Sequence, residues 1–274
     1  MNKIDFSYAS EIEHNFAQRL VIRTIEKLTG KQKLEKIYQD YSKAHSDPRY
    51  FWSGILEFMD IKIINKSKNN LNIPASGPLL IIANHPFGII DGLILCSIAS
   101  KYRKDFKIMT HETLKLIPEL DQFILPVEFN DKNKETIKNN INTSKKAKKY
   151  LLDGGLLIIF PSGGVTVSKN REQAMESDHW KLFTAKLIQQ TRSDVLPIYF
   201  DGRNGFLFNL FASKIKNQTL KYSSYLHETR RKIGKEIIIY SDNIIKFRDI
   251  EEIKDRNSLL NYLKIRTYNL INMQ

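Results

Sequence analysis

The stretch from Leu79 to Gly92 reads Leu-Leu-Ile-Ile-Ala-Asn-His-Pro-Phe-Gly-Ile-Ile-Asp-Gly. Its first five residues predict a buried strand, because a fully buried strand reads as a short apolar run bounded by turn residues. The proline and glycine that follow Asn-His predict a tight turn, and Asp91 lies where the next helix begins. Polar groups at the carboxyl end of a strand in an open α/β sheet lie where such folds bind ligands. This stretch therefore predicts a strand, a functional turn and a helix.

The turn can bring the carboxylate of Asp91 back to the imidazole of His85. A carboxylate hydrogen-bonded to one ring nitrogen fixes the tautomer and stabilises the imidazolium, which leaves the other nitrogen to accept a proton. The alternative reading is that His85 is an ordinary turn residue and Asp91 only a helix cap.

Two further strands end in polar or flexible residues. Leu156 to Val165 reads Leu-Leu-Ile-Ile-Phe-Pro-Ser-Gly-Gly-Val, and the backbone N–H groups of such a loop can bind an anion or oxyanion. Val195 to Asn204 ends in Asp-Gly-Arg-Asn, where Arg203 can hold a phosphate or carboxylate. Taken singly, the first is also compatible with an ordinary turn and the second with a salt bridge to a neighbouring loop.

Short apolar runs alternate with helical patterns along most of the chain, which predicts an α/β fold with a mixed, largely parallel sheet flanked by helices. Strands are predicted at 79–83, 106–109, 123–127, 156–160, 195–200 and 236–240, and helices at 10–29, 31–44, 91–103, 134–152, 179–191 and 249–271. We expect an N-terminal helical extension over 1–60 and one continuous α/β domain over 61–274.

Composition limits the classes of protein to consider. A chain of 274 residues with 42% hydrophobic residues is not intrinsically disordered. A net charge of +13 predicts an acidic partner, such as nucleic acid, an anionic membrane or an acidic carrier protein. The single cysteine, Cys96, excludes an intramolecular disulfide and a Cys-rich zinc site, and it suits a reducing cytoplasm. No segment reads as a signal peptide or transmembrane helix, so we expect a cytoplasmic protein that reaches membranes peripherally.

The motifs together resemble a known family. Asn84-His85 with a following aspartate, a strand ending in Phe-Pro-x-Gly and a strand containing Leu-Pro-Ile occur in the same order in glycerolipid acyltransferases typified by 1-acylglycerol-3-phosphate acyltransferase. The chain is more similar to a bacterial hemolysin-type subgroup, also called lysophospholipid acyltransferases, with Asn-His-Pro-Phe-Gly, Phe-Pro-Ser-Gly-Gly and Asp-Gly-Arg-Asn. The resemblance spans about residues 5 to 245.

The resemblance implies an acyl transfer in phospholipid or membrane lipid biosynthesis, without a covalent enzyme intermediate. His85 would be the general base on a lysolipid hydroxyl, which attacks the thioester of an acyl carrier protein or coenzyme A, and Asp91 would orient His85. No metal or redox cofactor is implied, and the thioester is a co-substrate. The residues expected to bind substrate are Asn84, Phe160, Pro161, Ser162, Gly163, Gly164 and Arg203.

Two departures from the family pattern bear on this reading. Five residues separate His85 from Asp91, where the usual spacing is four. The usual Phe-Pro-Glu-Gly-Thr-Arg loop is here Phe-Pro-Ser-Gly-Gly-Val, which lacks the acidic residue and the phosphate-binding arginine. Either Arg203, Lys169 or Arg171 replaces that arginine, or the acceptor is another lysolipid, such as a lyso-aminolipid.

Two other functions compete with acyl transfer. A serine-type lipid hydrolase or thioesterase would use Ser162 as nucleophile with His85 as base, but the Gly-x-Ser-x-Gly elbow is absent. A nucleic-acid-binding module would explain the charge, but none of its sequence motifs is present, so we expect no nucleic-acid partner.

Four segments are candidates for contact with anionic lipid on the inner face of the cell membrane. The basic run Lys145–Lys149 could instead dock an acidic acyl carrier protein, and its alternative is a solvated helix face. The other three are the amphipathic helix at 10–29, the aromatic cluster Tyr50–Trp52 and the apolar stretch Phe206–Phe211, which could also line an acyl channel. Packing within the protein is the alternative for the helix and for Phe206–Phe211.

Overall fold

The structure is a computed structural model. It describes residues 30–45, 47, 50–69, 71–111, 114, 117–128, 133–168, 170–205, 208 and 218–273. The helix expected at 10–29 and most of the stretch Phe206–Phe211 lie outside the described residues. In the part of the chain that is described, no helix is both long and apolar enough to cross a bilayer.

Seven strands form one sheet within the described residues, in the order β1-β7-β6-β2-β5-β3-β4. Their bounds are β1 Lys62–Asn65, β2 Leu79–Ala83, β3 Phe106–His111, β4 Ile124–Val127, β5 Leu156–Ile159, β6 Asp194–Phe200 and β7 Glu236–Ser241. All neighbours are parallel except β6 and β7, which are antiparallel. The predicted mixed, largely parallel sheet is confirmed, and β1 is a strand that the sequence pattern did not reveal.

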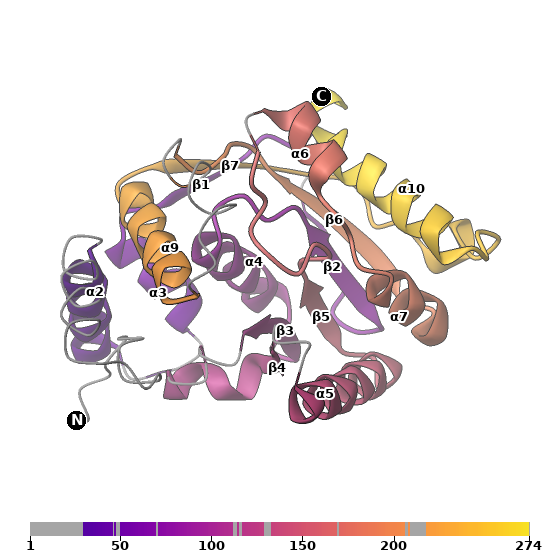
Figure 1. Ribbon diagram of the computed structural model, residues 1–274, viewed down its shortest axis with the longest axis horizontal. Helices are drawn as coiled ribbons and strands as arrows, with labels where there is room; N and C mark the ends of the chain where they lie inside the picture. Colours follow the sequence, from indigo (N-terminus) through magenta and orange to yellow (C-terminus); the bar gives the residue numbers. More distant parts are fainter. Residues whose placement is uncertain are drawn as a thin grey trace.

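Helices cover both faces of this sheet (Figure 1). They are α2 Lys31–Ala44, α3 Phe51–Phe58, α4 Ile89–Tyr102, α5 Lys134–Leu152, α6 Arg171–Ser177, α7 Phe183–Thr191, α9 Gln218–Lys232 and α10 Arg256–Tyr268, with short 3-10 turns η4 Pro118–Phe123, η5 Phe247–Asp249 and η6 Leu270–Asn272. The alternation of side chains along a strand divides the core in two. Leu79 and Ile81 of β2 pack with α3 and α4, whereas Leu80 and Ile82 pack with α5, α7 and α10.

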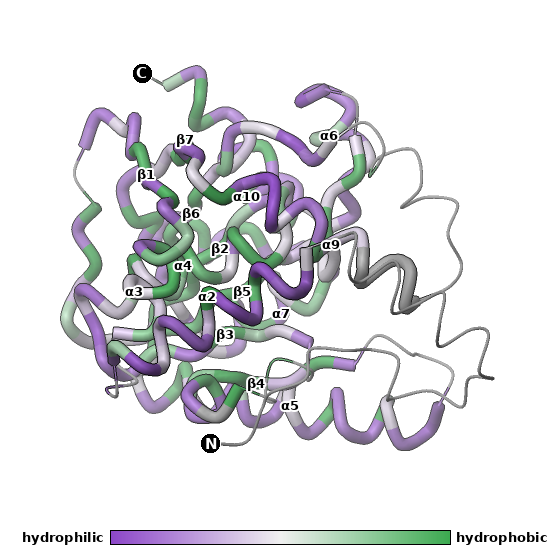
Figure 2. The backbone as a smooth tube through the Cα atoms, turned by 90° about the vertical axis from the view of Figure 1, so that its left-hand side faces the viewer, coloured by the Kyte–Doolittle hydropathy of each residue, from purple (hydrophilic) through white to green (hydrophobic). Residues whose placement is uncertain are grey.

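The central strands β2 and β5 are buried along their whole length, which explains why their sequences are continuous apolar runs. Figure 2 shows the same arrangement, with hydrophobic backbone segments gathered in the central strands and hydrophilic ones along the outer helices. The carboxyl ends of β2 and β5 therefore meet at one edge of a rigid sheet, and the loops that follow them are brought together there.

The helix predictions need three corrections. The helix expected over 179–191 begins only at Phe183, because the preceding residues form a separately hydrogen-bonded segment. The helix expected over 249–271 begins after Asp255, whose carboxylate caps it by accepting from the Ser258 N–H. Three helices, α3, α6 and α9, were not predicted at all. Helix α3 is only eight residues long, and α6 and α9 are rich in polar residues and show only a weak apolar period.

Residues before β1 belong to the same core as the sheet. Trp52 is almost fully buried, and its ring meets those of Phe106 and Phe123 edge-on at centroid distances of 6.1 and 5.6 Å. Phe51 is buried as well, so only Tyr50 of the cluster Tyr50–Trp52 faces solvent. This corrects the reading of that cluster as a membrane-inserting segment. The division of the chain at residue 60 stays a prediction.

Leu80→Ala should lower the free energy of unfolding by about 2–5 kcal/mol, because it leaves a cavity at a fully buried position of the central strand. The matched control is Leu152→Ala, at a position that is 57% exposed, and it should change stability by less than about 0.5 kcal/mol. Urea unfolding of both variants measures the difference. Equal losses would contradict the placement of β2 at the centre of the core.

Candidate active site

The turn between β2 and α4 is built around the carboxylate of Asp91. Its Oδ2 atom lies 2.9 Å from Nδ1 of His85, and it also accepts the backbone N–H groups of Phe87 and Gly88 at 2.8 and 3.0 Å. Gly88 has a φ of 74°, a left-handed conformation that favours glycine. The turn thus brings His85 and Asp91 together as predicted, and five intervening residues suffice to close the pair.

Asp91 is fully buried, and burial raises the pKa of its carboxyl group because the charged form loses water. The hydrogen bond to His85 and the two backbone N–H groups oppose this shift. The second oxygen, Oδ1, has no hydrogen-bond partner among the described residues. A carboxylate in this setting interacts strongly with any positive charge on the adjacent imidazole, because little water screens the pair.

The loop after β5 holds the other side of His85. The ring of Phe160 stacks on the imidazole with a centroid distance of 3.8 Å and an interplanar angle of 14°. The Thr166 N–H donates to the His85 carbonyl oxygen at 2.8 Å. His85 is thereby fixed on both its ring and its backbone, which presents the second ring nitrogen, Nε2, in a constant position.

Within this loop, Gly163 has a φ of 69° and its N–H donates to the Phe160 carbonyl at 2.9 Å. That N–H is therefore already engaged inside the turn. The Ser162 hydroxyl donates to the Gly164 carbonyl at 2.8 Å. None of the hydrogen bonds found among the described residues joins Ser162 to a histidine, so the arrangement gives no support to Ser162 as an activated nucleophile.

At the third strand end, the structure gives Asn84 and Arg203 surroundings that differ from those expected. The amide of Asn84 donates to the Phe200 carbonyl at 2.9 Å and accepts the Phe200 N–H at 2.7 Å. It is buried and ties the end of β2 to the end of β6. Arg203 is exposed, and its carbonyl accepts from Lys232 Nζ at 3.4 Å. Neither side chain lines the pocket described next.

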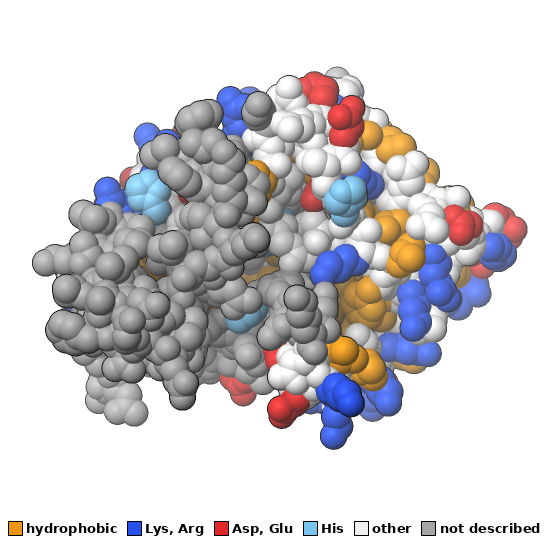
Figure 3. Space-filling model, in the orientation of Figure 1, with side chains coloured by type: hydrophobic (Ala, Val, Ile, Leu, Met, Phe, Trp, Pro, Cys, Tyr) orange, Lys and Arg blue, Asp and Glu red, His pale blue; other side chains and the backbone are white. Residues whose placement is uncertain are grey.

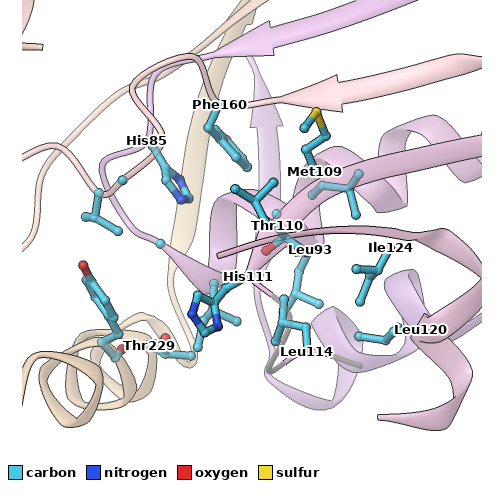
Figure 4. A pocket seen from close by; sticks show the side chains of 18 of the residues that line it. His85, Leu93, Met109, Thr110, His111, Leu114, Leu120, Ile124, Phe160 and Thr229 are labelled. Carbon is cyan, nitrogen blue, oxygen red and sulfur yellow. Dashed lines mark hydrogen bonds between the residues drawn. The ribbon is translucent and has the colours of Figure 1, made fainter. Parts of the chain in front are cut away.

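A cavity of about 360 Å³ opens beside His85. Figure 4 shows His85 and Phe160 side by side at one end, with aliphatic side chains at the other. Its walls are mainly apolar and come from α2, α3, α4, β3, β4 and η4; they include Leu93, Met109, Leu114, Leu120 and Ile124. Such a cavity suits a hydrocarbon chain whose reacting end lies at His85.

Of the residues expected to form the site, five line this cavity and four do not. His85, Phe160, Pro161, Gly163 and Gly164 are lining residues, whereas Asn84, Asp91, Ser162 and Arg203 are not. Asp91 nevertheless acts on the site through its contact with His85.

Sequence reasoning missed several polar lining residues, among them His111, Lys181 and Thr184. His111 is the last residue of β3, and its place at a strand end is a signal that could have identified it. Burial lowers the pKa of its imidazole, and the negative charge of Glu128 partly opposes this shift. Thr184 is fully buried, and its Oγ1 has no hydrogen-bond partner among the described residues. Nothing in the local pattern around Lys181 and Thr184 marks either residue as a pocket residue.

Lys181 lies against the glycines of the loop after β5. Its Cε and Nζ atoms would be 2.8 and 3.0 Å from a Cβ placed on Gly163, so only a glycine leaves room for this approach. The Lys181 N–H donates to the Pro161 carbonyl at 2.8 Å. The segment before it is anchored by buried Asp178, which accepts from Trp180 Nε1 and from the Tyr268 hydroxyl, both at 2.9 Å. These contacts place a positive charge at the loop.

The described residues contain no cluster of three or more His, Cys, Asp or Glu side chains able to hold a metal ion.

Residues 65–201, half of the chain, match the family model described as Acyltransferase. The chain belongs to this acyltransferase family. Two similar proteins are both named lyso-glycine lipid O-acyltransferase. The one from Phocaeicola vulgatus is 25% identical over 214 residues, which cover 77% of this chain and 72% of that protein. The one from Bacteroides thetaiotaomicron is 28% identical over 182 residues, covering 63% and 60%.

A solved structure with a similar fold is the 1-acyl-sn-glycerophosphate (LPA) acyltransferase PlsC from Thermotoga maritima. It has a TM-score of 0.50 and 10% identity, and it covers 93% of this chain and 97% of that one. At this identity the likeness concerns the fold alone. Together with the family match it confirms the predicted acyltransferase fold, and the enzyme is an O-acyltransferase, as the motifs suggested.

His85→Ala should leave a folded protein whose rate of acyl transfer is lower by about 10²- to 10⁴-fold, the usual contribution of a general base. Steady-state transfer assays and thermal unfolding of the purified variant measure this. Ser162→Ala is the control, because its hydroxyl contacts only a neighbouring carbonyl, and it should retain most activity. Near-normal turnover by His85→Ala would exclude the assigned base.

Asp91→Asn should lower the transfer rate by about 10- to 150-fold, since a hydrogen bond to a charged group is worth about 1.5–3 kcal/mol.

The same substitution should change how the free energy of unfolding depends on pH. Because burial raises the pKa of Asp91, the wild type loses stability as the pH rises from near its ordinary value of 3.8 through the raised pKa. The variant lacks this loss, so its stability relative to wild type should be greater at pH 7 than at pH 4. A variant with full activity would reduce Asp91 to a helix cap.

Proposed function

We propose that the enzyme transfers a fatty acyl group from a thioester to the hydroxyl of a lysolipid. The observation that carries this proposal is a His-Asp pair whose imidazole opens onto an apolar cavity. The cavity accommodates a hydrocarbon chain, and the pair supplies a base for a hydroxyl. The names of the two similar proteins agree with a lysolipid acceptor.

The reaction follows from the geometry of His85. Nδ1 faces Asp91, so Nε2 is the atom that accepts the proton of the acceptor hydroxyl as its oxygen attacks the thioester carbonyl. Asp91 stabilises the imidazolium that forms. When the tetrahedral intermediate collapses, the carbon–sulfur bond breaks, and the departing thiolate takes the proton from Nε2. The base is thereby regenerated, and an ester and a free thiol are the products.

The oxyanion of that intermediate needs hydrogen-bond donors near His85. The Gly163 N–H is engaged with Phe160, so it does not serve this purpose without a rearrangement of the turn. The Thr184 hydroxyl is buried at the cavity wall and has no partner among the described residues. We assign it, with the remaining N–H groups of the loop, as a candidate donor.

We further propose an acceptor with an anionic head group other than glycerol phosphate. The arginine of the usual loop is missing, and Arg203 is exposed outside the cavity lining. Arg171 donates to the side chains of Asn269 and Asn272, and Lys169 lies outside the described residues. Lys181 is the cation that adjoins the loop, and a glycine head group attached through its nitrogen would offer it a carboxylate. A lyso-aminolipid fits this charge.

The acyl donor is expected to be a thioester of acyl carrier protein or coenzyme A, acting as co-substrate, with no metal or redox cofactor. Purified enzyme offered both thioesters with a panel of lysolipids, followed by mass spectrometry of the products, tests donor and acceptor together. Product from a lyso-aminolipid supports the proposal, and release of free fatty acid alone, with no acylated lipid, overturns it.

Lys181→Met should raise KM for an acceptor that bears a carboxylate by about 10- to 100-fold, with little change in kcat, because a charge-assisted contact is lost at the head group. Arg203→Gln is the matched control and should leave KM near the wild-type value, since that side chain lies outside the cavity lining. Kinetics with an acceptor and its uncharged amide analogue measure both effects. An equal loss on the two acceptors would contradict the assignment.

A further inference from the structure

The outer side of α5 carries large apolar residues that face solvent. Ile137, Ile141 and Leu152 are 46, 50 and 57% exposed. An α-helix turns by 100° per residue, so these three side chains leave the helix axis within about 60° of one another. They therefore lie on one side of the helix. The inner side of the same helix packs on the core through Ala147 and Leu151, so the stripe is not needed to hold α5 in place.

The stripe is set among positive charges. Lys134, Lys138, Lys145, Lys146 and Lys149 are exposed on α5, while Glu135 is the single acidic residue within the helix. Figure 3 shows hydrophobic side chains lying next to Lys and Arg side chains over α5 and α7. Exposed aliphatic side chains interleaved with lysines are typical of helices that lie in the interface of an anionic membrane.

The same surface continues to the edge of the cavity. Leu182, which is 47% exposed, stands between Lys181 and Phe183, and both of these line the cavity. It immediately precedes α7, which packs against α5. The first turn of α5 follows β4 at the carboxyl edge of the sheet, the edge where His85 lies.

We propose that this surface, Ile137, Ile141, Leu152 and Leu182 with the lysines of α5, is the face that docks on an anionic lipid membrane. The inference rests on the proposed function only in taking the acceptor to be a lipid. Ile137 and Leu152 are separated by about 22 Å along the helix at 1.5 Å per residue. A straight stripe of this length, with lysines beside it, matches a flat lipid surface in shape and in charge.

Sedimentation with vesicles tests the surface without any activity measurement. The probes are phosphatidylcholine vesicles with and without phosphatidylglycerol, at low and high salt. Wild type should bind the anionic vesicles, and salt should weaken this binding. Lys138→Gln with Lys145→Gln should weaken it by about fivefold for each lysine removed. Ile137→Asn with Ile141→Asn should weaken it further and remove the part that persists at high salt.

Two controls change the same residue types elsewhere. Ile265→Asn replaces an exposed isoleucine of α10, and Lys101→Gln replaces an exposed lysine at the end of α4. Both should bind vesicles like the wild type. Equal binding by the α5 variants and the controls would overturn the proposal, as would wild-type binding that is indifferent to vesicle charge. Thermal unfolding shows that the variants are folded.

An acyl-transfer assay with a short-chain lysolipid, which is present as monomers, tests the membrane proposal separately from the proposed function. The α5 variants should turn over that acceptor at the wild-type rate, because no membrane is involved. A wild type inactive on every lysolipid would refute the function while leaving the vesicle result intact. If the α5 variants lost transfer from acyl carrier protein to the monomeric acceptor but kept vesicle binding, the surface would be a carrier site and the membrane proposal would be wrong.

Discussion

One buried oxygen atom, Oδ2 of Asp91, accepts three hydrogen bonds that define the site. They fix the turn after β2, the first turn of α4 and the tautomer of His85 together. A carboxylate is stable in this buried position only while these donors are in place, because an unpaired buried charge is strongly destabilising. The ring of Phe87, at the apex of the turn, lies under the ammonium of Lys232 at 3.9 Å, which ties α9 to the same turn.

The sequence predicted the parts of the molecule that depend on neighbouring residues. Six strands and the His85–Asp91 pair follow from apolar runs, turn residues and short spacings. Asn84 does not line the cavity, because its amide is engaged with the Phe200 backbone at the end of β6, and its role in binding substrate stays a prediction. The Arg203 side chain is exposed and does not line the cavity, and its role in binding substrate stays a prediction.

The cavity could not be predicted in the same way, because its walls come from segments far apart in the chain. Tyr38 of α2 and Leu120 of η4 line the same cavity as His85. The Tyr38 hydroxyl donates to the carboxylate of Glu119 at 3.1 Å, which links α2 to η4 although the two residues are far apart in the sequence. Nothing in the sequence of α2 or η4 indicates that these segments line a binding site. Their contribution depends on tertiary packing, which places an amphipathic helix and a short turn over the carboxyl edge of the sheet.

The His-Asp pair and the cation beside the loop after β5 come from different parts of the chain. The hydrogen bonds of the Asp91 carboxylate lie within the turn between β2 and α4, and the loop after β5 adds the Thr166 N–H on the His85 carbonyl and the Phe160 ring on the imidazole. Lys181 reaches the same loop from the segment before α7, and the Tyr268 hydroxyl of α10 anchors that segment by donating to Asp178. The loop therefore receives a cation from outside its own sequence, while the base and its carboxylate come from the turn after β2. The proposed acceptor, with an anionic head group other than glycerol phosphate, rests on this cation, because the loop lacks the arginine of the usual family pattern.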